Sequence, residues 1–149
     1  MKKYYFDREI CAECGGRCCK SIPAPCIPND IQRLYPSDTL DNSVLLALKS
    51  GRFSIDWYEG SNRGKPYVRP SVKGSEGNMY DPSWGGECTF LKEKGCELSE
   101  SKRPYYCKIV KPSAGGGCTT GVNGNQKLAA AATWKKVDLW QWRESYDNL

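Results

Sequence analysis

The stretch "CTFLKEKGCELSESKRPYYCK", residues 88–108, places three cysteines around two short apolar runs. Because the runs flank "KEKG", they predict a β-hairpin that brings Cys88 and Cys96 close together. Pro104 lacks a backbone N–H and favours the first position of a helix, which predicts a short helix carrying Cys107. A glycine-rich loop then carries one more cysteine. These residues form the second cysteine group of the chain: Cys88, Cys96, Cys107 and Cys118.

Arg103, directly before that proline, allows two interpretations. A guanidinium can offset thiolate charge and donate to backbone carbonyls, which would tie the start of the predicted helix to its surroundings. The alternative is a solvated surface charge. In neither case is Arg103 a metal ligand.

A second stretch, "CAECGGRCCK" at residues 11–20, holds four more cysteines in the pattern C-x2-C-x3-C-C. A C-x2-C turn can direct both thiolates to one metal because its backbone amides stabilise the sulfur charge. Adjacent side chains on an extended backbone diverge, so the last two cysteines are better suited to two sites, or to one site plus a reactive thiol. We call these residues the first cysteine group: Cys11, Cys14, Cys18 and Cys19.

The chain has nine cysteines and no histidine. Zinc-hydrolase sites built on imidazole and any Ser/His/Asp or Cys/His catalytic arrangement are therefore excluded. All-thiolate ligation leaves structural zinc, an iron–sulfur cluster or storage of a soft metal. We expect zinc or iron as the cofactor, with the ligands among the eight cysteines of the two groups. The ninth, Cys26, lies in an apolar setting and is expected to be a small buried residue.

The expected compartment and partners follow from the rest of the composition. The N-terminus has no apolar run of signal-peptide length, and no later stretch approaches the ~20 apolar residues of a membrane span. Closely spaced cysteines in odd number favour metal over disulfides in a reducing cytoplasm. The net charge is +5, but the basic residues are scattered, and two zinc sites of four thiolates each would lower it to +1. We therefore predict a cytoplasmic protein that binds a metal ion, and not nucleic acid or a membrane.

The fold class predicted for residues 1–149 is α+β: one small, irregular, cysteine-rich, metal-stabilised domain with short β-hairpins and a long C-terminal helix. The alternation of residues 53–58 predicts a half-buried strand, and residues 65–70, bracketed by prolines, predict an edge-like partner. Residues 73–87 predict an irregular loop. The predicted helices are a short one opened by Asn29 and Gln32 and ending at Leu34, one within residues 38–51, and the long one from Gln126 to Tyr146.

The sequence resembles a family of small bacterial zinc- or iron-chelating cysteine-cluster proteins, named for a C-x2-C-x2-C-C motif. The resemblance covers most of the chain and rests on "CAECGGRCC", on "PNDIQRL" at residues 28–34, and on residues 88–108. Residues 103–107, "RPYYC", are the most specific part. Two departures are the three residues between Cys14 and Cys18, where the motif has two, and Lys108, where arginine is common.

The resemblance implies chelation of zinc or iron, and it leaves three functions to compare. The favoured one is chelation, storage or presentation of a metal that also organises the fold. The alternatives are an iron–sulfur protein for redox chemistry or protein modification, and an interaction module that binds a protein partner and has structural zinc. Some family members are longer flagellin lysine N-methylases, but this chain has no recognisable methyl-donor site, so that activity is not expected. Whether the protein is an enzyme stays open.

Overall fold

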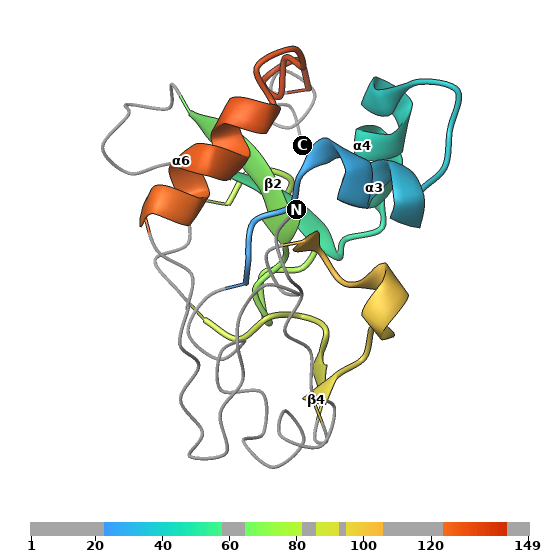
Figure 1. Cartoon of the computed structure of the whole chain (residues 1–149). Helices are drawn as coiled ribbons and strands as arrows, with labels where there is room; N and C mark the ends of the chain where they lie inside the picture. Colours follow the sequence, from blue (N-terminus) through green and yellow to red (C-terminus); the bar gives the residue numbers. More distant parts are fainter. Residues whose placement is uncertain (1–22, 58–64, 82–85, 93–94, 106–123, 143–149) are drawn as a thin grey trace.

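A computed structural model describes residues 23–57, 65–81, 86–92, 95–105 and 124–142 (Figure 1). These residues contain α-helices, a 3-10 helix and short strands, so the predicted α+β class is confirmed. In chain order the elements are α3 (Pro28–Leu34), α4 (Leu40–Lys49), β1 (Phe53–Trp57), β2 (Pro66–Pro70), β3 (Leu91–Lys92), β4 (Gly95–Cys96), η2 (Glu100–Lys102) and α6 (Gly124–Thr133).

Strands β1 and β2 form the pair that the sequence predicts, and the structure shows them antiparallel in the register Phe53↔Pro70 to Trp57↔Pro66. A further extended segment lies along the other edge of β1. The N–H of Ile55 donates to the oxygen of Met79 at 2.8 Å, and the N–H of Asp81 donates to the oxygen of Ile55 at 2.9 Å. The predicted loop over residues 73–87 is therefore irregular only in part, because its middle pairs with β1.

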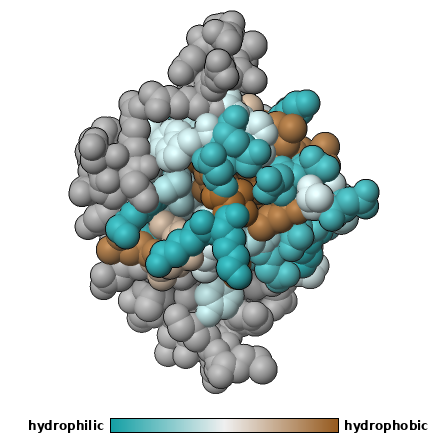
Figure 2. All heavy atoms as spheres, turned by 90° about the horizontal axis from the view of Figure 1, so that it is seen from above, coloured by the Kyte–Doolittle hydropathy of each residue, from teal (hydrophilic) through white to brown (hydrophobic). Residues whose placement is uncertain are grey.

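Helices flank the β1–β2 ribbon. In Figure 1, α3 and α4 lie side by side, with α4 against β1, whereas α6 lies against β2. The buried core draws residues from each of these elements, including Ile31, Val44, Phe53, Val68 and Ala130. Figure 2 shows hydrophilic side chains over much of the described surface seen from above, around a smaller hydrophobic area. No helix among the described residues is long and apolar enough to cross a membrane.

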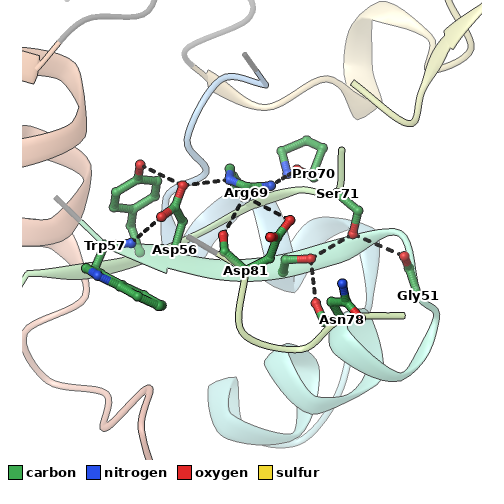
Figure 3. A network of polar contacts seen from close by, with 10 residues as sticks. Gly51, Asp56, Trp57, Arg69, Pro70, Ser71, Asn78 and Asp81 are labelled. Atoms are coloured by element: carbon green, nitrogen blue, oxygen red, sulfur yellow. Dashed lines mark hydrogen bonds and ion pairs between the residues drawn. The ribbon is translucent and has the colours of Figure 1, made fainter. Parts of the chain in front are cut away.

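Strand β1 is buried on both faces, so the prediction of a half-buried strand is wrong. Asp56 and Arg69 are 3% and 0% exposed, and the Arg69 Nε donates to Asp56 Oδ2 at 2.9 Å (Figure 3). The Arg69 Nη2 also donates to the main-chain oxygen of Asp81 at 2.6 Å, and Ser54 and Ser71 share a hydrogen bond of 2.9 Å. Ser54 and Asp56, the described polar residues of the alternating pattern, are thus buried with hydrogen-bond partners on a neighbouring segment.

Helices α3 and α4 are close to their predicted positions. Helix α4 begins after Thr39, whose side chain accepts the Asn42 N–H at 3.1 Å, and the chain leaves it at Gly51, with φ of +80°. Helix α3 begins earlier than predicted, at Pro28. The N–H that precedes it, on Ile27, donates to the carboxylate of Asp30 at 2.9 Å, so Asp30 and not Gln32 starts the helix.

The long C-terminal helix is not present: α6 ends at Thr133. The Trp134 N–H donates to the Ala131 oxygen at 3.0 Å, a bond between residues three apart that tightens the chain into turns. The Asp138 side chain then accepts the Trp140 N–H at 3.0 Å. These turns bury Trp134 and Leu139. A helix that continued past Thr133 would place both side chains elsewhere. Residues 143–146, the last of the prediction, lie outside the described residues.

Candidate metal centre

The structure describes two of the eight predicted ligands, Cys88 and Cys96. No disulfide joins the cysteines in the described part of the chain. The other six predicted ligands lie outside the described residues: Cys11, Cys14, Cys18, Cys19, Cys107 and Cys118.

Cys88 and Cys96 belong to one hairpin, as the sequence predicts. Strands β3 and β4 are antiparallel and pair Leu91 with Cys96. The Leu91 N–H donates to the Cys88 oxygen at 2.9 Å, so Cys88 lies one tight turn before β3. The two side chains are near enough for negative charge on Cys96 to raise the pKa of Cys88. The hairpin therefore holds the backbone of Cys96 opposite Leu91, one tight turn from Cys88.

A backbone amide two residues later favours negative charge on each of these sulfurs. The N–H of Leu98 donates to the Cys96 Sγ at 3.4 Å. The backbone N–H of Phe90 lowers the pKa of the Cys88 thiol. A hydrogen bond to the charged form stabilises that form, so both amides favour thiolate over thiol. The backbone beside both cysteines is therefore suited to sulfur that carries negative charge.

Burial acts in the opposite direction on Cys88. Its residue is 6% exposed, and burial raises the pKa of the thiol to about 12, with a smaller contribution from Cys96. The amide of Phe90 and the positive charges of Arg52 and Arg69 only partly offset this. Without a cation the thiol stays protonated at neutral pH. A bound divalent metal supplies the charge that makes a buried thiolate favourable.

The segment that carries Cys88 is fixed beside the end of β2. Cys88 pairs with Val72 in an antiparallel bridge, and the Thr89 N–H donates to the Ser71 oxygen at 2.8 Å. Gly86 allows the backbone before Cys88 to lie directly against the Val72 side chain. Its φ is +143°, and a Cβ there would lie 2.5 Å from the Val72 Cγ1. Only glycine fits both the backbone conformation and the space.

Arg52, which follows α4, holds both sides of the hairpin, and the sequence analysis missed it. Its Nε donates to the Thr89 Oγ1 at 3.0 Å, and its Nη2 donates to the Glu97 Oε1 at 3.2 Å. The guanidinium also lies 4.2 Å from the centre of the Phe90 ring. No local sequence pattern could reveal this role, because the partners are 37 and 45 residues away.

Helix α3 contacts the segment that leads toward Cys107. The Tyr105 N–H lies 3.1 Å from each carboxylate oxygen of Asp30. The Arg33 Nη2 donates to the Arg103 oxygen at 2.9 Å. The Arg103 Nε in turn donates to the Leu98 oxygen at 3.3 Å, so of the two interpretations of Arg103 this contact supports the one in which the guanidinium donates to a backbone carbonyl.

Cys26 is completely buried in the core, as expected for a small buried residue. Its N–H donates to the Val68 oxygen at 2.7 Å, and its oxygen accepts the Trp134 Nε1–H at 2.9 Å. Burial raises the pKa of its thiol well above the usual range, and the nearby charges of Asp30 and Cys88 add to this. Within the described ranges, no three or more cysteine or acidic side chains form a group that could hold a metal ion.

Comparisons with known proteins bear on the whole chain. Comparison with curated proteins and with solved structures gave no match. A family model, described as "CxxCxxCC: Putative zinc- or iron-chelating domain", matches residues 10–139. This match spans well over half of the chain and includes all nine cysteines. The chain therefore belongs to the CxxCxxCC family.

Proposed function

We propose that this protein chelates zinc or iron through cysteine thiolates, and that its role is to hold the metal or present it to a partner. One observation carries the proposal: Cys88 lies one tight turn before the strand that pairs with β4, and Cys96 on β4 accepts at its sulfur the N–H of Leu98, two residues later. The proposed ligands come from both cysteine groups: Cys11, Cys14, Cys18, Cys19, Cys88, Cys96, Cys107 and Cys118.

The donor chemistry agrees with these metals. Thiolates are soft ligands that bind zinc and iron well, whereas magnesium and calcium prefer oxygen. The described thiols are held in an oriented hairpin, and Arg52 adds positive charge beside it. When metal binds, Cys88 and Cys96 would lose their protons, and the amides of Phe90 and Leu98 would stabilise the sulfur charge that remains.

Cys26 is proposed to stay outside the ligand set. Its main-chain N–H and oxygen already connect β2 to Trp134, and its side chain is enclosed by the core. A ligand at this position would bring metal into the apolar interior. Its contribution is therefore packing.

An iron–sulfur cluster with a redox or protein-modification role is the second candidate, because thiolates also ligate such clusters. Anaerobic purification, metal analysis and a visible spectrum separate the two. Zinc or mononuclear iron in stoichiometric amount, with no inorganic sulfide, supports chelation. Equal amounts of iron and inorganic sulfide, with broad visible absorption, support the cluster.

Substitution tests the ligand assignment. Cys88→Ser and Cys96→Ser each remove one thiolate, and both should lower metal retention in competition with a chelator. Cys26→Ala is the matched control, since it removes a neighbouring buried thiol, and it should keep the metal content of the parent. Full metal retention by the variant with serine at both 88 and 96 would contradict the proposal.

A further inference from the structure

The carboxylate of Asp30 joins two segments that are far apart in the sequence. It is 1% exposed and accepts the N–H of Ile27 at 2.9 Å, which starts α3. It also accepts the N–H of Tyr105, which is 75 residues later and two residues before Cys107. Starting the helix requires only the first of these bonds. The second therefore has another consequence, which is to fix the backbone at Tyr105.

Arg33, one turn further along α3, makes a second connection to the same segment. Its Nη2 lies 3.3 Å from the Asp30 Oδ1 and donates to the Arg103 oxygen at 2.9 Å. One turn of α3 thus binds two main-chain groups of the 103–105 stretch, one acceptor and one donor. Such a pair fixes both the position and the direction of a backbone.

The connection continues to a sulfur atom. The Arg103 Nε donates to the Leu98 oxygen at 3.3 Å, and the Leu98 N–H donates to the Cys96 Sγ at 3.4 Å. A continuous path of hydrogen bonds therefore runs from α3 through Arg103 and Leu98 to Cys96.

We propose that Asp30 and Arg33 are positioning residues for the metal centre. They hold the 103–105 stretch, and through Arg103 they orient the Leu98 amide that donates to the Cys96 sulfur. The inference rests on the proposed function, because the thiolate they orient is a proposed ligand. Neither residue binds the metal.

If the Asp30 carboxylate only stabilised the fold, its loss would affect metal binding no more than the loss of another buried carboxylate. Asp56 provides that comparison. Asp56 is also buried and also paired with an arginine, but its partners are Arg69, Trp57 and Tyr67 on the ribbon. Asp30→Asn and Asp56→Asn each replace a buried carboxylate by an amide of similar shape. Only the first changes the path to Cys96.

The experiment measures zinc retention by full-length parent, Asp30→Asn and Asp56→Asn proteins against a competing chelator, well below their melting temperatures. Loss of groups that orient ligands typically costs about 10–100-fold in metal affinity. We expect a loss of this size for Asp30→Asn, with faster hydrogen exchange of the Tyr105 amide, and parent-like affinity for Asp56→Asn. Arg33→Ala should show the same direction, and its 34% exposed side chain makes it a second variant if Asp30→Asn does not fold.

A spectrum of the cobalt-substituted proteins adds a readout of the sulfur ligands. In Asp30→Asn the thiolate-to-cobalt absorption should change in position or intensity, because the environment of the Cys96 sulfur changes. Parent-like zinc affinity, cobalt spectrum and Tyr105 exchange in both α3 variants would overturn the inference and leave the proposed function standing. A parent protein that binds neither zinc nor iron would overturn the proposed function itself.

Discussion

The indole N–H of Trp134 donates to the main-chain oxygen of Cys26, 2.9 Å away and 108 residues earlier in the chain. Both residues are buried, so this oxygen has no access to water. The bond connects the turn after α6 to the segment that enters α3. It therefore links the C-terminal part of the described core to the region that follows the first cysteine group.

Replacement of this indole by a phenyl ring should destabilise the protein without changing its metal content. Trp134→Phe removes the donor and leaves the buried main-chain oxygen of Cys26 without this hydrogen bond. An unsatisfied buried acceptor lowers the free energy of unfolding by about 1–3 kcal/mol. Denaturant unfolding measures the free energy, and metal analysis of the folded variant provides the control. An unchanged unfolding midpoint would show that the bond contributes nothing to stability.

The sequence predicts the elements whose causes are local. Helix α4 follows from its cap at Thr39 and its glycine stop, and the β1–β2 ribbon follows from residues within 20 positions of each other. The end of α6 was mispredicted because the alanine run favours a helix, while the turns that bury Trp134 depend on a partner 108 residues away.

The candidate metal centre also has one part that the local sequence predicts and another part that depends on distant segments. The hairpin that unites Cys88 and Cys96 was predictable from its apolar runs and central turn. The contacts that fix it were not, because the partners of Arg52 and of Asp30 are contributed by distant segments. Hydrogen bonds of this kind depend on the tertiary arrangement, and neither residue type nor spacing in the sequence encodes them.

The buried pair of Asp56 and Arg69 predicts a pH dependence. Burial raises the pKa of Asp56, and the charge of Arg69 opposes this only in part. The folded protein therefore binds this proton more tightly than the unfolded chain does. Its contribution to stability is complete below the unfolded pKa, about 3.9, and is lost as pH rises through the folded pKa.

Asp56→Asn removes this titration, so the stability of the variant relative to the parent should increase as pH rises from about 3 to about 6. Unfolding free energies of both proteins at several pH values in this range provide the measurement. A relative stability that falls over the same range would mean that Arg69 outweighs burial and that the pKa of Asp56 is lowered.

Gly86 should be required for a tightly held hairpin. In Gly86→Ala, the new Cβ would lie 2.5 Å from the Val72 Cγ1, so the segment must move away from β2 and take Cys88 with it. Gly74→Ala is the matched control: its φ is also positive, at +92°, but a Cβ there meets nothing within 4 Å. Chelator competition should show weaker zinc retention for Gly86→Ala than for Gly74→Ala. Equal retention by the two variants would exclude a role for the close approach at Gly86.

Removal of the metal should loosen the hairpin before it unfolds the core. The sequence predicts a small metal-stabilised domain, and such a domain would depend on its metal as a whole. The described contacts indicate a more local dependence, because α4, β1, β2 and α6 bury Phe53, Val68 and Ala130 in one core. The β3–β4 hairpin has only two residues in each strand, and so small a sheet is marginally stable by itself.

Hydrogen exchange before and after verified chelation of the metal tests this prediction residue by residue. The Leu98 amide, whose acceptor is the Cys96 sulfur, should exchange much faster in the metal-free protein, because the thiolate charge that strengthens its bond is lost when the sulfur is protonated. The Ile55 amide donates to Met79 inside the ribbon and should keep its protection. If both amides lose protection together, the metal stabilises the whole domain, and the core is not sufficient to keep the ribbon folded without it.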